Sequence, residues 1–327
     1  MYGMRGLCHE LFGGGYQRDP GSRLCIPHHR PLVEGQERID GRMLLIDRST
    51  TTPMKLKEAL KDVLSLEELG LVVGSYDIIG DIAIVIIPPG LECKEHLIAE
   101  AILQIHKNLR TVSKRAGNYD GEFRTIALTV IAGEDLQEAE HRENGIRFSL
   151  HPEKVYFSVR SSNERKRISL LVRPGEDVLV MFSGIGAFPL VIAGNSQARE
   201  IVGVEKNPDA HRYALKSLAG NRKIRNVLLY EGDVVEVVPQ LSRTFDRVLM
   251  PLPRTSESYL GPALAALRSG SWLHFYDFQS SDTFSQSIEK IHQACEIAHR
   301  KLIASNRVVC GHCSPRIYRI CIDALIE

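Results

Sequence analysis

Long apolar runs are missing from this chain of 327 residues. No stretch approaches the roughly 20 apolar residues that a membrane-spanning helix needs. Residues 1–21 contain no continuous apolar core, so they are not typical of a secretory signal. The seven cysteines are odd in number and scattered, which fits a reducing compartment better than a disulfide framework. These absences predict a cytoplasmic location.

A strong excess of one charge is missing as well. The 41 basic and 40 acidic residues leave a net charge of +1, which argues against a globally basic surface. Any nucleic-acid-binding surface must therefore come from local clustering of cations. The length is sufficient for two domains with a substantial core, and 43% hydrophobic and 25% charged residues are typical of a globular protein.

A recognisable spacing of metal ligands is also missing. Cys8-His9 and Cys25 with His28-His29 match no common zinc pattern, and the glycines of residues 13–15 between them suggest a mobile loop. The pair Cys310 and Cys313 lies on an expected late strand, not ahead of a helix, so we interpret it as packing. The sequence predicts no metal site, and residues 1–42 form a short N-terminal segment of little periodicity.

Residues 43–150 predict a smaller α/β domain. Leu56, Leu60, Val63 and Leu64 recur at helical spacing. The β-branched run 78–87 predicts one strand that ends at two prolines. Further elements are expected as strands at 43–46, up to 130, at 145–149 and at 154–158, and as a helix at 95–108.

The strongest local cluster of positive charge lies in the same region. It consists of Lys107, Arg110, Lys114 and Arg115. Long cations that converge near a turn can neutralise a nucleic-acid backbone. A solvated face is the commoner meaning of such a run, and the sequence alone leaves both interpretations open.

From residue 171 onward, strands and helices alternate as in a doubly wound parallel sheet. Two late strands, around 308–310 and 317–325, lie too close together for a helical crossover, so they must pair as an antiparallel hairpin. The predicted fold class is α/β, with a mostly parallel seven-stranded sheet and an antiparallel C-terminal hairpin. The five earlier strands are expected at 178–182, 201–205, 227–230, 245–250 and 272–278, and helices at 208–219, 256–267 and 283–300.

The stretch Asp177–Ile192 is the centre of this second part. It predicts a buried strand, a glycine turn and a helix, so backbone N–H groups and a helix N-terminus face a ligand. Glu205, about 20 residues further on, can bind ribose hydroxyls, and Asp233, after the next strand, can bind an adenine amino group. The turn lacks the third glycine of the dinucleotide fingerprint. The pattern therefore favours S-adenosylmethionine over a dinucleotide, and a methyltransferase over a dehydrogenase.

Several sequence blocks occur in the order found in one enzyme family. They are Tyr76–Ala83, Gly121–Thr125, Val155–Ser158, Asn163–Arg165, Met181–Gly186, Val204–Pro208 and Leu252-Pro253. Over about residues 43–327 the chain resembles the archaeal and eukaryotic tRNA guanosine-37 N1-methyltransferases. The resemblance implies a Rossmann-like class I methyltransferase domain at 151–327 with S-adenosylmethionine as cofactor, preceded by a domain for tRNA recognition at 43–150. The implied partner is the anticodon loop of tRNA, and we expect a monomer.

The resemblance also implies roles for individual residues. Glu164 would act as the general base that removes the N1 proton of guanine, Arg124 would stabilise charge on O6, and Tyr156 would line the site. Because Ser161 precedes Glu164 by three residues, a capping box is the alternative role of Glu164. Expected cofactor contacts are Arg165, Phe182, Ser183, Gly184, Gly186, Glu205, Lys206, Asp233, Val234 and Pro251, and expected tRNA contacts are Lys107, Arg110, Lys114, Arg115 and Pro253.

Two departures from the family pattern keep alternatives open. Much of the family has Asn at the position of Pro251, which offers neither an amide nor a backbone N–H. Residues 1–42 also look too short or degenerate for the leading domain that many members carry. The alternatives are a wybutosine-pathway tRNA transferase, moving an aminocarboxypropyl or methyl group to a modified guanosine, and a tRNA-binding paralogue that has lost activity.

Overall fold

The structure is a computed structural model that describes residues 38–39, 42–43, 55–252 and 254–327. The chain divides into two compact units, residues 1–52 and residues 53–327. The first unit contains the antiparallel pair β1 (Arg38–Ile39) and β2 (Arg42–Met43). The candidate metal ligands of residues 1–42 and the predicted tRNA contact Pro253 lie outside the described residues.

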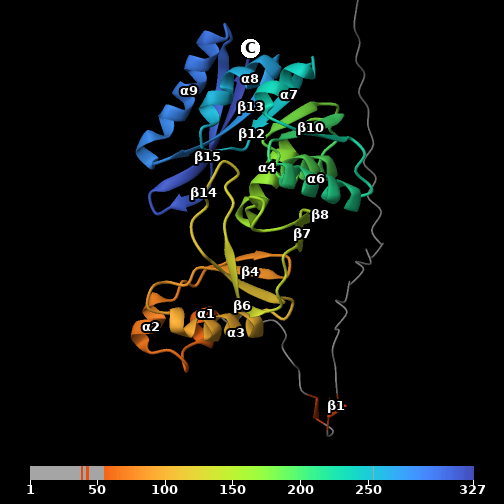
Figure 1. The fold of residues 1–327 in the computed structure, drawn as a ribbon. Coiled ribbons are helices and arrows are strands. Elements are labelled where there is room, and N and C mark those ends of the chain that lie inside the picture. The colour runs from red at the N-terminus through yellow and green to blue at the C-terminus, as the bar shows by residue number, and fades with distance from the viewer. Residues whose placement is uncertain (1–37, 40–41, 44–54, 253) are drawn as a thin grey trace, which may run out of the picture. The chain divides into compact units, whose positions relative to one another are not determined.

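A seven-stranded sheet dominates the second unit, in the order β11-β10-β9-β12-β13-β15-β14 (Figure 1). The first five of these pair in parallel, whereas β15 is antiparallel to both β13 and β14. The predicted α/β sheet with its closing hairpin is therefore confirmed. The strands are β9 (Asp177–Met181), β10 (Glu200–Glu205), β11 (Val227–Glu231), β12 (Phe245–Met250), β13 (Leu267–Gln279), β14 (Leu302–Ser314) and β15 (Ile317–Ile326).

Helices cover both faces of this sheet. Because side chains alternate along a strand, Val178 and Val180 of β9 pack into one core and Leu179 and Met181 into another. The first core includes residues of α4 (Ser162–Leu171), α5 (Ala187–Asn195) and α6 (Pro208–Gly220). The second includes residues of α7 (Val234–Gln240), α8 (Leu260–Ala266) and α9 (Phe284–Ile297). The sequence analysis did not predict α7.

A four-stranded sheet in the order β3-β4-β5-β6 forms the smaller part. Its strands and helices are β3 (Asp77–Ile79), β4 (Ile82–Val85), β5 (Thr111–Arg115), β6 (Leu128–Gly133), α1 (Leu56–Ala59), α2 (Leu66–Leu71) and α3 (Glu95–Ile105). The prediction of one strand over 78–87 is wrong, because Gly80 adopts φ +59° and turns the chain into the β3–β4 hairpin. Val63 is exposed, since the chain turns after the short α1.

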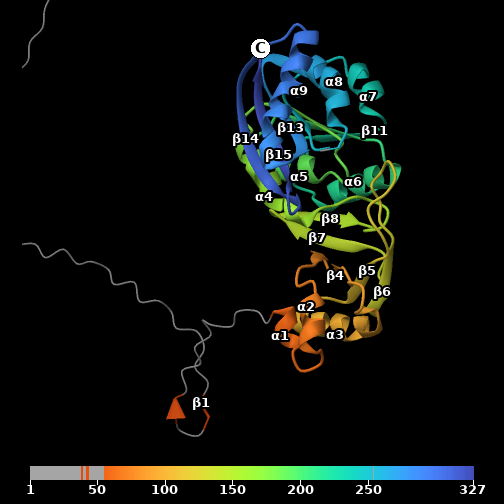
Figure 2. The same ribbon diagram turned by 90° about the vertical axis from the view of Figure 1, so that its left-hand side faces the viewer.

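The hairpin of β7 (Ala139–Glu143) and β8 (Ile146–Leu150) packs against α6 (Figure 2). The Ser149 N–H donates to Ser217 Oγ at 3.0 Å, and Phe148 is fully buried in the same core as β9. We therefore propose that the boundary between the two parts lies near residue 137, not at residue 150. The strand expected at 154–158 is not formed, and its residues follow an irregular path.

Short 3₁₀ helices complete the second unit at Glu92–Lys94, Val159–Ser161, Ser256–Tyr259 and Ser281–Thr283. Within the described ranges, no helix combines the length and the apolar character needed to cross a membrane.

A substitution of Gly203 on β10 would test the packing beneath the glycine turn. A Cβ there would lie 2.9 Å from Leu229 Cδ2 and 3.1 Å from both Pro189 Cγ and Ser183 Cβ. We expect Gly203→Ala to lower the free energy of unfolding by about 1–3 kcal/mol, because overpacking displaces these neighbours. Chemical denaturation measures the change. Gly220→Ala is the control, since its Cβ would meet nothing within 4 Å, and an equal effect of both changes would contradict the prediction.

Candidate functional site

The turn after β9 is held in an uncommon backbone conformation. Phe182, Gly184 and Gly186 adopt φ values of 60°, 57° and 78°. Gly186 is the N-cap of α5, and a Cβ on it would lie 3.3 Å from Ala214 Cβ of α6. The turn therefore brings the N-terminus of α5 toward one site, as a ligand-binding loop requires.

Glu205 connects this turn with the end of β10. Its carboxylate accepts hydrogen bonds from the backbone N–H of Gly184 at 2.6 Å and of Asn207 at 2.8 Å. Burial raises the pKa of Glu205 above its ordinary value, although hydrogen bonds from Asn207 and Gly184 oppose the shift. The predicted ribose-binding acid is thus next to the glycine turn.

Asp233 lies at the end of the neighbouring strand β11, where it caps α7. Its carboxylate accepts from the Val235 N–H at 3.1 Å and lies 3.1 Å from Lys206 Nζ. The Val235 N–H and the Lys206 ammonium together lower the pKa of Asp233. Lys206 Nζ also contacts Glu122 at 2.5 Å, so it bridges the end of β10 and the loop before β6.

Two adjoining pockets lie at this edge of the sheet. The first, which we call the acid-lined pocket, has a volume of about 500 Å³, within the usual range for small-molecule sites. Predicted site residues that line it are Arg124, Tyr156, Phe182, Gly184, Glu205, Lys206, Asp233, Val234 and Pro251. The second, the Glu164 pocket, shares Tyr156, Phe182, Gly184 and Pro251 with it. A ligand in one pocket is therefore adjacent to a ligand in the other.

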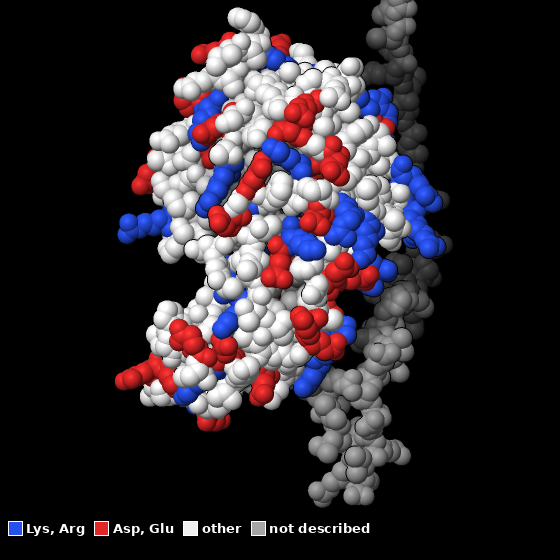
Figure 3. Space-filling model, viewed as in Figure 1, with Lys and Arg blue, Asp and Glu red and all other residues white. Residues whose placement is uncertain are grey.

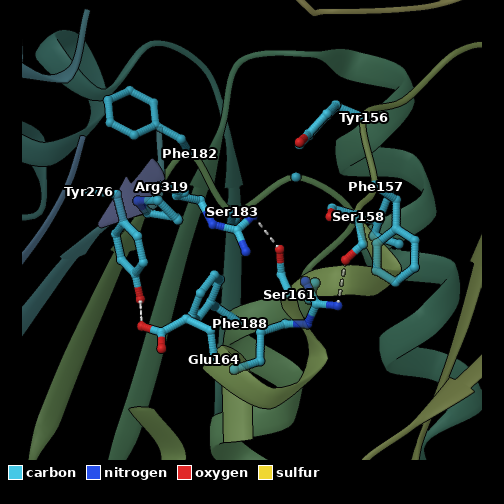
Figure 4. Close-up of a pocket in the computed structure, with 15 residues that line it drawn as sticks. Tyr156, Phe157, Ser158, Ser161, Glu164, Phe182, Ser183, Phe188, Tyr276 and Arg319 are labelled. Carbon is cyan, nitrogen blue, oxygen red and sulfur yellow. Dashed lines mark hydrogen bonds between the residues drawn. The ribbon is translucent and has the colours of Figure 1, made fainter. Parts of the chain in front are cut away.

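Glu164 lies in the second pocket on α4, with 6% of its surface exposed (Figure 4). The Tyr276 hydroxyl donates to its Oε1 at 2.6 Å. Arg167 donates from Nη2 to Oε1 and from Nε to Oε2, both at 2.8 Å. A carboxylate oxygen accepts about two hydrogen bonds, so Oε2, with one donor among the described residues, retains room for a proton.

The capping box predicted as an alternative role of Glu164 is not formed. Ser161 precedes α4 but its side chain makes no capping bond. Instead, Ser161 Oγ accepts from Arg319 Nη1 at 2.7 Å (Figure 4). The Glu164 side chain is directed toward Arg167 and Tyr276, so it is available to the pocket and does not close the helix end.

Arg124 and Tyr156 join the two pockets. The Arg124 guanidinium lies over the Tyr156 ring at 4.4 Å, and Tyr156 lines both pockets. Arg124 is a non-glycine residue with φ 52°, an uncommon conformation that often marks a functional position. Arg124 and Tyr156 thus line the acid-lined pocket, and Tyr156 and Glu164 line the adjoining Glu164 pocket.

Arg165 is placed differently from the other expected cofactor contacts. It is 3% exposed, forms a two-pronged ion pair with Glu143 of β7, and donates from Nη2 to Ser158 O at 2.9 Å. It lines the Glu164 pocket together with Ser183. Its Nε and Nη2 donors already have partners, so these groups fix the pocket wall. Gly186 lines neither pocket. Its contribution to the site is the backbone conformation of the turn.

The predicted basic cluster does not converge. Arg110 precedes β5 and Arg115 ends it, so they lie about 16 Å apart along the strand. Arg110 pairs with Asp81 at 3.3 Å and also with Glu134, Lys114 with Glu95 at 2.6 Å, and Arg115 with Asp77 at 3.0 Å. Lys107 is exposed. On the face in Figure 3, Lys and Arg alternate with Asp and Glu, so no field of one sign covers it.

One group of potential metal ligands occurs among the described residues. His274, Cys321 and Asp323 lie together and buried. However, Asp323 accepts from Arg167 at 2.7 Å and His274 Nε2 lies 2.6 Å from Arg247 Nη1. Two guanidinium groups would repel an added cation, so we interpret the group as a hydrogen-bond network.

Sequence reasoning missed several residues around Glu164. Tyr276 and Arg319 line its pocket, and Arg167 and Asp323 lie behind it. The sequence did contain one indication of this network, because polar residues recur at every second position inside two apolar strands. His274 and Tyr276 on β13 pair with Asp323 and Cys321 on β15. Polar residues in such positions indicate a buried hydrogen-bond network.

Comparison with known proteins agrees with this geometry. The model of the TRM5/TYW2 methyltransferase domain matches residues 139–303, and that of the TYW2 N-terminal domain matches residues 56–136. The chain belongs to the TRM5/TYW2 methyltransferase family. The predictions of this family, of its Rossmann-like class I fold and of S-adenosylmethionine as its cofactor are confirmed.

Individual relatives cover most of the chain. The tRNA (guanine(37)-N(1))-methyltransferase Trm5b of Pyrococcus abyssi is 33% identical over 304 residues, 93% of this chain and 88% of that protein. Its wild-type crystal structure has a TM-score of 0.75 at 32% identity and covers 90% of this chain and 86% of that one. A structure of aTrm5 in complex with tRNALeu has a TM-score of 0.73 at 26% identity, covering 88% and 84%.

A relative with a different reaction is also similar. The tRNA(Phe) (4-demethylwyosine(37)-C(7)) aminocarboxypropyltransferase of Methanocaldococcus jannaschii is 28% identical over 257 residues, 77% of this chain and 98% of that protein. Relatives of this chain thus include enzymes whose names state transfer of different groups.

Glu205 provides a direct test of cofactor binding. We expect Glu205→Gln to weaken binding of S-adenosylmethionine at least about tenfold, because a charged hydrogen bond to ribose is worth about 1.5–3 kcal/mol. Isothermal titration calorimetry measures the affinity. Glu231→Gln is the matched control, since Glu231 pairs in register with Glu205 on β11 and is exposed. Equal affinities of the two variants would contradict the assignment.

Proposed function

We propose that this chain methylates N1 of guanosine at position 37 of tRNA. The observation that supports it is the pair of adjoining pockets. Glu164 and Tyr156 line one of them, and Arg124 and Tyr156 line the other together with Glu205 and Asp233. The 33% identity to a tRNA (guanine(37)-N(1))-methyltransferase over 93% of the chain agrees with this reaction. The target base would leave its stack and enter the Glu164 pocket, as enzymes that modify bases require.

The donor requirements are met by residues described above. S-adenosylmethionine, when bound, supplies an electrophilic methyl group on its sulfonium. Glu205 would hold the ribose hydroxyls, and Asp233 with Val234 would hold the adenine. The turn from Phe182 to Gly184 would bring the reactive end of the donor next to Pro251, which lines both pockets.

The acceptor requirements concern guanine N1, whose lone pair is not free while N1 carries a proton. Glu164 would accept that proton on its carboxylate as the N1–methyl bond forms. Electron density that moves toward O6 would be stabilised by Arg124, whose position over Tyr156 keeps its guanidinium at the pocket. The two charged groups would act on neighbouring positions, N1 and O6, of one edge of the base.

Recognition of tRNA would involve the smaller part of the chain. The related aTrm5 has been solved in complex with tRNALeu, and Lys107, Arg110, Lys114 and Arg115 remain our candidates for phosphate contact. The ion pairs of the last three would have to open or be shared with phosphate. The anticodon-loop contact, a monomeric state and a cytoplasmic location belong to this proposal.

A second candidate function is transfer of the aminocarboxypropyl group of the same donor to a wybutosine precursor. It is favoured by the match of residues 56–136 to the TYW2 N-terminal domain and by the 28% identity to an aminocarboxypropyltransferase. Pro251 in place of the family Asn also leaves open a tRNA-binding paralogue without activity.

Isotopic labels in two positions of the donor distinguish these possibilities. We expect a tRNA transcript with G at position 37 to gain label from methyl-labelled S-adenosylmethionine and none from carboxyl-labelled donor. A transcript with A at position 37 should gain neither, because the 6-amino group of adenine cannot accept a hydrogen bond from Arg124 and its N1 lone pair would face the Glu164 carboxylate. Uptake of the carboxyl label by a tRNA that already carries the wybutosine precursor would favour the second candidate. A G transcript that binds but stays unmodified would overturn the first proposal, and a precursor-bearing tRNA that also stays unmodified would overturn the second.

The role of Glu164 can be tested separately. Glu164→Ala should retain cofactor binding and lose about 10²–10⁴-fold in single-turnover rate, the usual contribution of a general base. Glu296→Ala on α9 is a control in which an exposed carboxylate is removed far from either pocket. Undiminished turnover of Glu164→Ala would remove Glu164 as the base.

Arg124 should act on the rate more than on affinity. We expect Arg124→Ala to lower the single-turnover rate about 10²–10³-fold, the usual cost of a lost donor to a developing oxyanion. The apparent Kd for tRNA, measured by filter binding, should change little. A variant that binds tRNA weakly yet reacts at the original rate when saturated would show that Arg124 binds tRNA and does not stabilise O6.

A further inference from the structure

A buried chain of polar groups extends from Glu164 across the sheet. Arg167 donates from Nε and Nη2 to Glu164, and from Nη1 to Asp323 Oδ2 at 2.7 Å. Asp323 Oδ1 lies 2.6 Å from His274 Nδ1, and His274 Nε2 lies 2.6 Å from Arg247 Nη1. Four elements, α4, β15, β13 and β12, therefore contribute to one connected network.

Hydrogen-bond chemistry fixes the protonation of the His274 ring. Arg247 has donors only, so His274 Nε2 must accept and the ring proton must be on Nδ1, which donates to Asp323. Burial lowers the pKa of His274, so the ring is neutral. Arg247 is itself paired with Glu176 at 2.8 Å, so its charge is compensated on the far side of the network.

Asp323 is consequently a buried anion. Burial alone would raise the pKa of Asp323, but hydrogen bonds from His274 and Arg167 hold that pKa well below its ordinary value. One positive charge, on Arg167, is thus shared between two carboxylates, those of Glu164 and Asp323. The sheet register enforces this sharing, because Asp323 pairs with His274 across β15 and β13.

The other groups that face Glu164 are mostly neutral. Burial raises the pKa of Cys310 on β14 to about 12 and that of Cys321 on β15 well above its ordinary value. The same cause raises the pKa of Tyr276 on β13, so its hydroxyl remains a donor. The charged groups nearby are Arg167, Asp323 and Arg319, which is held by Ser161 and the Cys310 carbonyl oxygen.

We propose that Arg167 and Asp323 are positioning residues that set how strongly Glu164 binds a proton. Arg167 holds the carboxylate in one orientation, and Asp323 takes up part of the Arg167 charge. Without that sharing, a fully paired Glu164 would be too weak a base, because an adjacent cation favours the ionised carboxylate. The inference rests on the proposed function, in which Glu164 removes the N1 proton.

Substitutions of Asp323 and Arg167 should change the proton affinity of Glu164 in opposite directions. In Asp323→Asn the whole Arg167 charge falls on Glu164, so Glu164 binds a proton less strongly. In Arg167→Gln the carboxylate keeps the Tyr276 hydrogen bond but loses its cation and faces Asp323, so it binds a proton more strongly. Since the base must be ionised to act, the rate rises with pH as Glu164 loses its proton.

The experiment is a pH–rate profile of single-turnover methylation with enzyme and S-adenosylmethionine in excess over tRNA. We expect the acid limb of Asp323→Asn to move about one unit to lower pH and that of Arg167→Gln about one unit to higher pH. The plateau rate of Asp323→Asn should fall about tenfold, because a weaker base transfers the proton less readily. Tyr276→Phe should move the limb to higher pH by a smaller amount.

A matched control separates this effect from loss of stability. Asp277→Asn removes another buried carboxylate of β13, which is 5% exposed and lies 3.0 Å from Nζ of Lys290 on α9. It should lower the Tm and leave the acid limb in place. Each variant is checked for cofactor binding and thermal unfolding, and if Arg167→Gln fails to fold, Tyr276→Phe supplies the upward shift.

The inference is overturned if the acid limb of the pH–rate profile stays in place in both variants. It is also overturned if the limb moves in the same direction in Asp323→Asn and Arg167→Gln. Such a result leaves the proposed function intact as long as wild-type protein methylates and Glu164→Ala does not. A wild-type protein without methyl transfer, or a fully active Glu164→Ala variant, instead overturns the proposed function and this inference with it.

Discussion

Burial of β9 on both faces is the constraint on which the rest of the structure depends. All five of its residues are buried, in two separate cores that hold helices against opposite sides of the sheet. Because this strand cannot shift without exposing both cores, the turn that follows it has a fixed position. Glu205 ends β10, the strand beside it, and Asp233 follows β11, the next strand in the sheet. The Gly184 N–H is within hydrogen-bond distance of Glu205. The cofactor pocket is thus a result of core packing.

Charge in the site is organised by a different rule, because several of its ionised groups are held in pairs. Lys206 bridges Glu122 and Asp233, Arg165 is paired with Glu143, and Arg167 lies between two carboxylates. Buried charges without partners would destabilise the fold by several kcal/mol each. The same pairing leaves few groups free to change protonation, which is one reason for assigning the proposed acid–base role to Glu164.

The sequence predicted the large sheet well because apolar runs, glycine turns and terminal acids follow one another there with regular spacing. Glu205 and Asp233 were found because strand ends are easy to locate. Prediction from the sequence failed where a contact joins segments that are distant in the chain. Gly80 turns what looks like one strand into a hairpin, and β8 packs on α6 through Ser217, which no local pattern indicates. The ion pairs of Arg110, Lys114 and Arg115 depend on neighbours 19 to 38 residues away, so spacing alone suggested a cluster that does not exist.

The position of β15 between β13 and β14 has a consequence for biogenesis. This strand follows every other part of the site in the chain, yet it carries Arg319 in the wall of the Glu164 pocket and Asp323 behind it. Chains are folded progressively as the ribosome synthesises them, so β9 to β13 can assemble around the cofactor turn before β15 emerges. Until then β13 has an open edge, Tyr276 and His274 lack their cross-strand partners, and the acid–base chemistry is incomplete. A nascent chain could therefore acquire its cofactor pocket before it becomes competent to act on tRNA.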